Sequence, residues 1–209
     1  MKNKAPITLA ITGASGAQYA LRLLQALVAE GHPIYLLISK AAQMVIAVET
    51  DLAMPSHHGK AAAFLEERYQ AYPGQIRLFG KEDWMSPVAS GSGAPKHMVV
   101  CPCSTGTLSA IATGASDNLI ERAADVVLKE RRPLVLMVRE TPLHLGHLRT
   151  MTALAEMGAV IAPPLPAFYS KPASIAEMVD QSVGRALDLF GLDWSAVRRW
   201  GGLKGPSTE

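Results

Sequence analysis

The 209-residue chain lacks the features that mark membrane-spanning, metal-binding or nucleic-acid-binding proteins. Aromatic residues make up 6% of it, and the net charge is +2 with scattered basic residues, apart from the Arg131-Arg132 and Arg198-Arg199 doublets. A nucleic-acid-binding face needs a dense basic stripe with interleaved aromatics, and a membrane-spanning helix needs roughly 18 consecutive apolar residues. Neither pattern is present, so we expect no nucleic-acid partner and no membrane.

Cysteine is also scarce, because the chain has only Cys101 and Cys103, on either side of a proline. They are too close for an ordinary disulfide and too few for a metal cage, and the histidine pairs elsewhere have no acid or cysteine beside them. We therefore expect buried, reduced thiols, no metal and a cytoplasmic protein. The N-terminal apolar stretch is interrupted by Gly13 to Gly16, where the core of a secretory signal would continue.

Short apolar runs alternate with helix-period segments along the chain. The runs are continuous rather than alternating, which is typical of parallel strands covered on both faces. Strands alternating with helices predict an α/β fold, a doubly wound open parallel sheet with helices on both faces, in a Rossmann or flavodoxin-like three-layer sandwich. The expected strands are Ile7–Thr12, Ile34–Ser39, Ile76–Phe79, Met98–Cys101, Leu134–Val138 and Val160–Ala162. The expected helices are about Gly16–Glu30, Lys40–Asp51, Lys60–Tyr72, Thr105–Thr113, Leu119–Arg131, Leu145–Met157 and Ile175–Phe190.

The length fits one domain better than two, and we place that domain at residues 1–192. Residues 193–209 form a C-terminal tail that carries Trp194 and Trp200. Because two large aromatic side chains are poorly suited to solvent, we expect the tail to dock on this or a neighbouring subunit. The glycine-rich loop Met85–Lys96 has the composition of a flexible linker or of a ligand lid.

The turn Gly13-Ala14-Ser15-Gly16 follows the first expected strand and precedes the first expected helix. A dinucleotide fingerprint has glycines spaced G-x-G-x-x-G and an acid at the end of the second strand. Here the spacing is G-x-x-G, Tyr19 takes the place of a further glycine, and the second strand ends in Ser39-Lys40. These departures argue against NAD, although the N–H groups at the start of the helix and Ser15 can hold a phosphate.

Hydroxyl side chains follow several of the expected strands, and ligands of doubly wound sheets bind beyond these strand ends. Ser39, Ser104 and Thr107 would lie there beside Ser15. Each one alone is more simply a helix cap or a turn residue. Together, these neutral donors favour a ligand, and they suit a mononucleotide phosphate with a ribityl chain.

Four longer stretches carry a more specific signal than the glycine turn. They are ITGASGAQYALRLL, CPCSTGTLSAIATG, ASDNLIERAADVVLKERRPLVLMVRETPLHLGHL and PPLPAFYSKPASIAEMVD. In content and order they closely resemble the flavin prenyltransferase family, the UbiX-type flavoproteins, and the similarity covers roughly Ile7 to Leu189.

The resemblance implies a homo-oligomer, a dodecamer, that binds FMN at subunit interfaces. Members of the family join a dimethylallyl group from dimethylallyl phosphate to N5 and C6 of reduced FMN. The prenylated FMN is the cofactor of UbiD-type decarboxylases, in ubiquinone biosynthesis or aromatic acid decarboxylation.

Two other functions stay open at this point. FMN-dependent cysteine decarboxylases of the same superfamily carry Pro-Ala-Ser-Ala-Asn-Thr where this chain has Pro102 to Thr107. Gly106 stands in place of the asparagine, which argues against cysteine decarboxylation. The other possibility is an FMN carrier without catalytic activity.

The resemblance also assigns residues to the site. The implied cofactor-binding residues are Gly13, Ala14, Ser15, Ser39, Ser104, Thr105, Gly106, Thr107 and Arg139. The implied donor-binding residues are Lys129, Tyr169 and Arg185, with Ser90, Arg122 and Trp200 as further candidates. Since the chain has no Asp-rich run to hold Mg²⁺, protein cations must neutralise the leaving phosphate.

The implied catalytic residues are Ser15, Glu49, Lys129 and Glu140. Glu140 is assigned as the acid that protonates the leaving phosphate, Glu49 handles the proton on flavin N5, and Ser15 bridges flavin and phosphate. Each assignment has a simpler alternative, namely a surface salt bridge between Arg139 and Glu140, or a solvent-facing helix residue for Glu49. Arg185 could likewise be an ordinary surface arginine, and Tyr169 a loop tyrosine.

Overall fold

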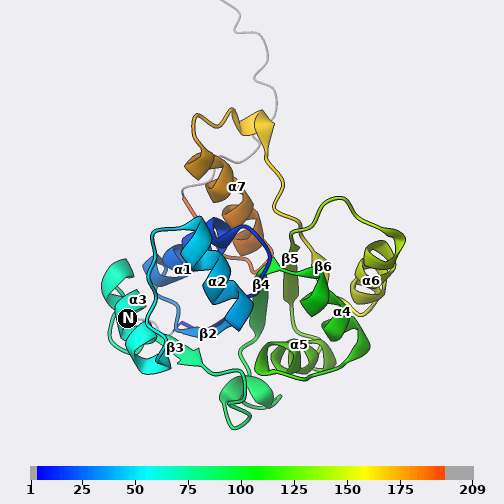
Figure 1. The fold of residues 1–209 in the computed structure, drawn as a ribbon, viewed down its shortest axis with the longest axis horizontal. Helices are drawn as coiled ribbons and strands as arrows, with labels where there is room; N and C mark the ends of the chain where they lie inside the picture. The colour runs from blue at the N-terminus through cyan, green and yellow to red at the C-terminus, as the bar shows by residue number, and fades with distance from the viewer. Residues whose placement is uncertain (1–3, 196–209) are drawn as a thin grey trace, which may run out of the picture.

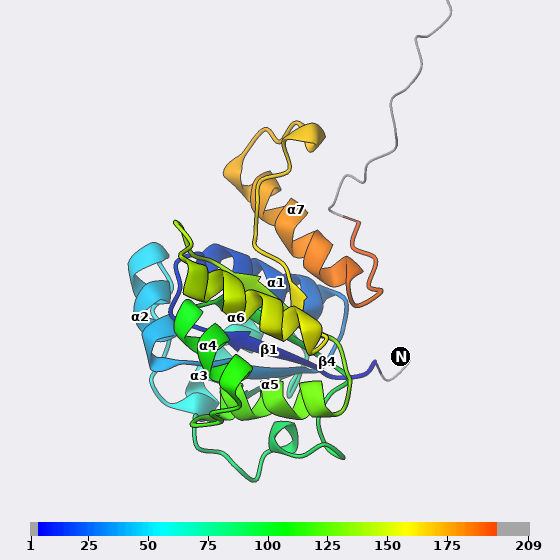
Figure 2. The same cartoon turned by 90° about the vertical axis from the view of Figure 1, so that its right-hand side faces the viewer.

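The structure is a computed structural model that describes residues 4–195 (Figures 1 and 2). Its centre is a six-stranded, entirely parallel sheet in the order β3-β2-β1-β4-β5-β6. The strands are β1 (Ile7–Ile11), β2 (Ile34–Ile38), β3 (Ile76–Phe79), β4 (His97–Cys103), β5 (Leu134–Val138) and β6 (Val160–Ile161). The predicted doubly wound parallel sheet is confirmed, and its direction of winding reverses between β1 and β4.

Helices cover both faces of the sheet (Figure 1). One layer contains α1 (Ala17–Ala29), α2 (Lys40–Glu49), α3 (His58–Tyr69) and α7 (Ile175–Asp188). The other contains α4 (Thr105–Thr113), α5 (Leu119–Lys129), α6 (Leu145–Glu156) and the short 3-10 helix η1 (Pro87–Ala89). A second 3-10 helix, η2 (Phe168–Ser170), lies in the segment that leads to α7. This segment extends away from the sheet in Figure 2.

The core has two halves because successive strand residues point to opposite faces. In β1, Leu9 packs with the α1 and α7 layer, whereas Ala10 packs with the α4 and α5 layer. Cys101 and Cys103 of β4 are fully buried and unpaired. Burial raises the pKa of both thiols, that of Cys103 to about 12. The prediction of buried thiols is confirmed.

The observed elements differ from the predicted ones mainly at their ends. β4 runs further in both directions than predicted, because a register shift between Val100 and Cys103 keeps the strand paired past Pro102. α5 stops at Lys129 because Arg131 adopts a left-handed conformation, with φ of 53°. The N–H groups of Arg131 and Arg132 then bond back to the last turn of the helix, as in a Schellman cap.

Candidate functional site

The turns after β1 and β4 are joined at the point where the winding reverses. Thr12, whose side chain is buried, donates from Oγ1 to the Pro102 carbonyl at 2.7 Å and accepts from the Ser104 N–H at 2.8 Å. These bonds hold the glycine turn against the start of α4. A crevice at this position is the general ligand site of doubly wound sheets.

Two of the predicted hydroxyl donors cap helices at this edge. Ser39 accepts from the Ala42 N–H at the start of α2, and Ser104 accepts from the Thr107 N–H at the start of α4. The capping interpretation therefore holds for both. This capping still leaves the edge able to bind an anion. The Ser39 hydroxyl caps by accepting a hydrogen bond and so keeps its own hydrogen to donate, and the other N–H groups at the two helix starts suit an anion beyond this edge.

Two glycines at this edge have different roles. A Cβ on Gly13 would lie 2.5 Å from the Cβ of Ala41, so only glycine lets α2 approach the turn. A Cβ on Gly106 would meet nothing within 4 Å. The first glycine serves packing, whereas the second leaves space beside the start of α4 that a ligand can fill. The donors and this space fit an FMN ribityl phosphate.

The Glu49 carboxylate occupies the start of α1. Its Oε2 accepts from the N–H groups of Gly16 at 2.8 Å and Ala17 at 2.9 Å. An anion from the chain itself thus takes N–H groups that could otherwise hold a phosphate. The alternative of a solvent-facing Glu49 is wrong, since its carboxylate faces the turn.

The pKa of Glu49 is lowered overall. Burial is the largest single influence and raises the pKa. Hydrogen bonds from the Ser15 side chain and from the Ala17 and Gly16 N–H groups, together with the positive charge of Arg139, lower it by more than burial raises it. The carboxylate is therefore ionised at neutral pH and holds the Ser15 side chain.

Arg139 and Glu140 follow β5 at the same edge. The Arg139 Nε donates to the Ser15 carbonyl at 3.1 Å, so the Arg-Glu motif contacts the glycine turn across 124 positions of the sequence. Glu140 is exposed and accepts from the Thr141 N–H at 3.0 Å. No ion pair joins Arg139 to Glu140 in the described part of the chain, so the alternative of a surface salt bridge is wrong.

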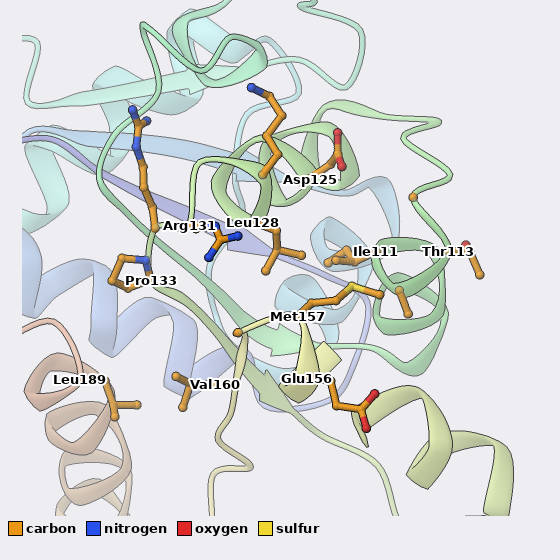
Figure 3. A pocket seen from close by; sticks show the side chains of 15 residues that line it. Ile111, Thr113, Asp125, Leu128, Arg131, Pro133, Glu156, Met157, Val160 and Leu189 are labelled. Carbon is orange, nitrogen blue, oxygen red and sulfur yellow. The ribbon is translucent and has the colours of Figure 1, made fainter. Parts of the chain in front are cut away.

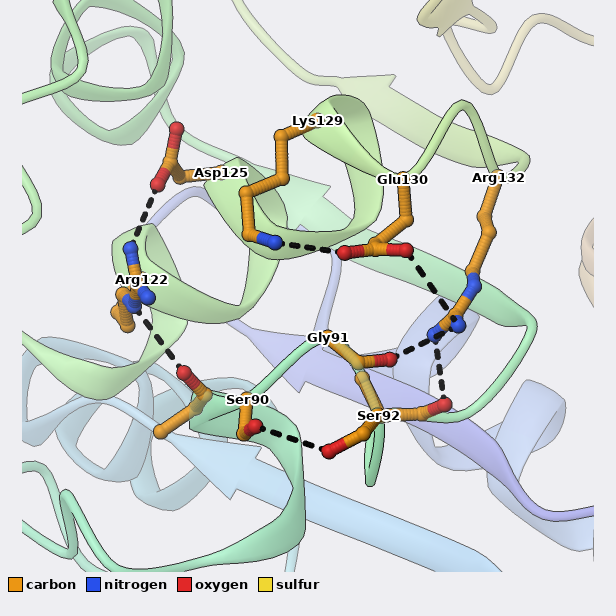
Figure 4. A network of polar contacts seen from close by, with 10 residues as sticks. Ser90, Gly91, Ser92, Arg122, Asp125, Lys129, Glu130 and Arg132 are labelled. Carbon is orange, nitrogen blue, oxygen red and sulfur yellow. Dashed lines mark hydrogen bonds and ion pairs between the residues drawn. The ribbon is translucent and has the colours of Figure 1, made fainter.

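Three of the predicted donor-binding residues lie on or against α5. Lys129 ends α5 just before β5 begins, which places it at the amino edge of the sheet. Arg122, in the first turn of the same helix, donates to the Ala89 carbonyl of the Ser90 loop, and a Cβ on Gly91 of that loop would lie 2.9 Å from the Lys129 ammonium (Figure 4). The five residues of β5 separate the two edges by about 16 Å at roughly 3.3 Å per residue.

A cavity of about 1100 Å³ opens at this amino edge (Figure 3). Its wall includes Asp125 and Lys129 of α5 and Glu156 of α6, together with the apolar side chains of Leu128 and Met157. In the single chain, therefore, Lys129 lines a cavity at the edge of the sheet opposite the turn Gly13 to Gly16.

Tyr169 and Arg185 form a third group, on the segment around α7. Tyr169 is half-exposed on η2, and the exposed Arg185 of α7 pairs with Asp188 at 2.8 Å. A cavity of about 310 Å³ lies between the end of the sheet and α7, and Arg185 lines it with Ala167 and Ser182. Salt bridging between Arg22 and Asp180 fixes α7 to α1, with Nη2 to Oδ2 at 3.0 Å.

The tail is described only in part. Trp194 packs against the core layer of α1 and α7, and the Arg22 guanidinium lies 5.1 Å from its ring centroid. Trp200 lies outside the described residues.

Three partners of the predicted site residues were not identified from the sequence. A Cβ on Gly16 would lie 3.0 Å from the Tyr19 ring. Burial, followed by the charge of Cys101, raises the pKa of the Tyr19 hydroxyl, while the charge of Arg139 lowers it. Glu130 and Arg132 contact Lys129 and the Ser90 loop (Figure 4). A signal for these two was present in the motif Lys-Glu-Arg-Arg itself.

The described residues include neither a metal-binding cluster nor a membrane-spanning helix. Within residues 4–195, no group of three His, Cys, Asp or Glu side chains is placed to hold a metal ion. No helix in residues 4–195 has the length and apolar character required to cross a membrane.

The fold and its polar edge define a mononucleotide-binding flavoprotein, and the sequence profile of the Flavoprotein family matches residues 1–187. The flavin prenyltransferase UbiX of Pseudomonas aeruginosa is 58% identical over 195 residues, which is 93% of each chain. The chain belongs to the UbiX flavin prenyltransferases, and the family resemblance is confirmed.

Solved structures agree with this assignment. AnUbiX (PadA1), in complex with FMN and dimethylallyl pyrophosphate, is 44% identical with a TM-score of 0.85, over 96% of this chain and 100% of that one. A dodecameric FMN-dependent Ubix-like decarboxylase from Escherichia coli O157:H7 is 38% identical with a TM-score of 0.82, over 95% and 100%. A PPC decarboxylase mutant, at 19% identity and a TM-score of 0.57, shares the fold alone.

Proposed function

We propose that this protein joins a dimethylallyl group from dimethylallyl phosphate to N5 and C6 of reduced FMN, and so makes prenylated FMN for a UbiD-type decarboxylase. The observation that carries the proposal is the likeness to AnUbiX, which holds FMN and a dimethylallyl donor. In the net reaction the C–O bond to phosphate breaks, and the five-carbon unit bonds to N5 and C6. The hydrogens displaced from N5 and C6 end on the alkene carbon and on the leaving phosphate.

The carboxyl edge would bind FMN. Ser39 and the turn Ser104 to Thr107 supply hydroxyl and N–H donors for the phosphate and ribityl chain. The turn Gly13 to Ser15 and the Arg139 side chain, which are bonded to each other, then lie against the flavin ring. Since Glu49 takes the first N–H groups of α1, the FMN phosphate is better accommodated at α2 and α4.

Ser15 and Glu49 would control the proton on flavin N5. An ionised Glu49 binds the Ser15 side chain, so that the serine hydroxyl donates to the carboxylate and offers a lone pair to the flavin. This arrangement favours removal of a proton from N5 as the new C–N bond forms.

The donor phosphate would be bound by Lys129, Arg122, Ser90, Tyr169 and Arg185, with Glu140 as its acid and Trp200 covering the site. Lys129 and Ser15 lie at opposite edges of the sheet, so one chain cannot bring both to the same substrate. The site is then completed between copies, which agrees with an FMN site at subunit interfaces and with a dodecamer. Exposed apolar side chains on α2, such as Met44 and Val48, are suited to contact between copies.

We treat residues 1–192 as one FMN-binding domain and 193–209 as a tail that docks on a subunit, a view supported by the packing of Trp194. We place the protein in the cytoplasm, where buried free thiols such as Cys101 and Cys103 are common.

Phosphate release under anaerobic conditions tests the proposal. The wild-type protein with reduced FMN and dimethylallyl phosphate should release one phosphate per flavin consumed, and omission of either compound should abolish the release. Glu140→Gln should slow release about 100-fold while FMN binding is retained. Release without flavin would indicate a phosphatase, and no release with FMN still bound would indicate a carrier.

A further inference from the structure

Arg132 connects two parts of the amino edge that carry predicted phosphate ligands. Its Nη1 donates to the Ala94 carbonyl and its Nη2 to the Gly91 carbonyl, each at 2.8 Å (Figure 4). These carbonyls belong to the loop that contains Ser90. The Arg132 side chain is 23% exposed, so this clamp is largely shielded from water.

The same guanidinium faces the ion pair that holds Lys129. The Lys129 Nζ donates to Glu130 Oε1 at 2.6 Å, and Glu130 Oε2 lies 3.9 Å from Arg132 Nη2. The pKa of Glu130 is lowered, first by the Lys129 hydrogen bond and charge and then by Arg132. Both carboxylate oxygens therefore have cationic neighbours, which orients Lys129 toward the Ser90 loop.

Gly91 makes this close approach possible. A Cβ on Gly91 would overlap the Glu130 carboxylate and crowd the Lys129 ammonium. The loop, α5 and the turn that follows it thus form one packed unit, although the loop has the composition of a flexible linker. Arg122 and Arg132 bind three of its carbonyls and so hold the loop against α5.

We propose that Arg132 is a positioning residue for the donor phosphate, which sets the Ser90 loop directly and the Lys129 ammonium through Glu130. The inference rests on the proposed function, since it takes Lys129 and Ser90 as ligands of the dimethylallyl phosphate. Arg132 itself faces the loop carbonyls and Glu130, so it acts through its neighbours.

The guanidinium shape is essential to this role. Two carbonyls at fixed positions match the planar fork of arginine, whereas a lysine ammonium is a point charge that satisfies one of them. Arg132→Lys keeps the charge and loses the fork, and Arg132→Met loses both. Donor affinity should therefore decrease in the order wild type, Arg132→Lys, Arg132→Met.

Calorimetric titration of the FMN-loaded protein with dimethylallyl phosphate tests the inference. Arg132→Lys should weaken donor binding roughly tenfold, which corresponds to about 1.4 kcal/mol, with FMN affinity and Tm close to wild type. The control is Arg131→Lys, the same change at the exposed neighbouring position, which should leave donor affinity unchanged. Equal donor affinity in wild type and Arg132→Lys would overturn the inference, and so would a parallel loss of FMN affinity and Tm, which indicates a purely structural role.

A double-mutant cycle with Lys129→Met adds a readout that general destabilisation does not affect. If Arg132 acts partly through Lys129, the two changes should weaken donor binding by less than the sum of their separate effects. Full additivity would contradict that route. Wild-type protein that binds the donor without forming prenylated flavin would contradict the proposed function and leave the positioning role standing.

Discussion

The Glu49 carboxylate accepts a hydrogen bond from the backbone N–H of Gly16 at 2.8 Å, and thereby closes the start of α1 to other anions. In dinucleotide-binding proteins this helix start holds the pyrophosphate. Here the chain places its own carboxylate there and binds the Ser15 side chain to it. The turn that resembles a phosphate loop therefore positions an acid and a hydroxyl.

Glu49→Gln is expected to lower the free energy of unfolding at pH 7 by about 1 kcal/mol, because a neutral amide bonds the two N–H groups less strongly than a carboxylate. The lowered pKa of Glu49 makes this contribution pH-dependent. It is present above the ordinary glutamate pKa of about 4.3 and is lost as the pH falls through the lower value of the folded state. Urea unfolding across this range should show wild type and variant converging in acid, with the exposed Glu67→Gln as control. A difference that is constant with pH would contradict the electrostatic origin.

Gly13 and Gly106 should respond differently to alanine. Gly13→Ala places a Cβ 2.5 Å from that of Ala41, so we expect a loss of about 1–3 kcal/mol from overpacking. Gly106→Ala meets open space and should leave the free energy of unfolding near wild type, yet weaken FMN binding if the cofactor fills that space. Thermal unfolding and fluorescence titration with FMN separate the two effects. Unchanged FMN affinity in Gly106→Ala would contradict the placement of the cofactor beside α4.

His97 should make the protein less stable in mild acid. Burial, then the charges of His32 and Lys96, lower its pKa, so the unfolded chain binds a proton that the folded chain resists. The stabilisation is complete above the unfolded value of about 6.5 and is lost as the pH falls below it. The ring centroids of His97 and Phe190 are 4.9 Å apart, and Phe190 lies just after α7. The end of this helix should therefore loosen first.

Denaturant midpoints at pH 8 and pH 5.5 check this prediction. The midpoint should fall in acid for wild type and fall less for His97→Gln, whereas the exposed His57→Gln should behave like wild type. Equal acid sensitivity of His97→Gln and wild type would rule out His97 as the source.

Mixing two inactive variants should restore activity if the site is shared between copies. Ser15→Ala removes a group at the carboxyl edge and Lys129→Ala one at the amino edge. When the two proteins are co-expressed, random assembly into closed oligomers should yield roughly a quarter of wild-type activity from sites with both groups intact. Prenylated FMN formed by the mixed oligomer is the measurement. Activity no greater than that of the separate variants would place both groups in one chain's site.

The parallel sheet could be predicted because continuous apolar runs such as Leu134–Val138 have few other uses in a chain of this length. The capping of α2 and α4 by Ser39 and Ser104 could likewise be predicted, since serine is a common cap before a helix. Contacts set by tertiary packing could not be predicted from the sequence. Nothing local in the sequence indicates that Glu49 turns back to Gly16, 33 positions earlier.

The position of Lys129 follows from the order of the secondary-structure elements alone. A helix that precedes a parallel strand must end at the amino edge of the sheet, so a residue at the end of α5 cannot share an edge with Ser15. A family motif identifies side chains that act together, but it does not state which copy supplies each one. The chain topology supplies that missing information.

The mass of the flavin after reaction tests the central claim most directly. The protein is incubated anaerobically with reduced FMN and dimethylallyl phosphate, and the released flavin is analysed by mass spectrometry. A prenyltransferase should yield a flavin heavier than FMN by one C₅H₈ unit, and only when enzyme, reduced FMN and donor are all present. Recovery of FMN at its original mass, with the protein folded and FMN-bound, would contradict the account.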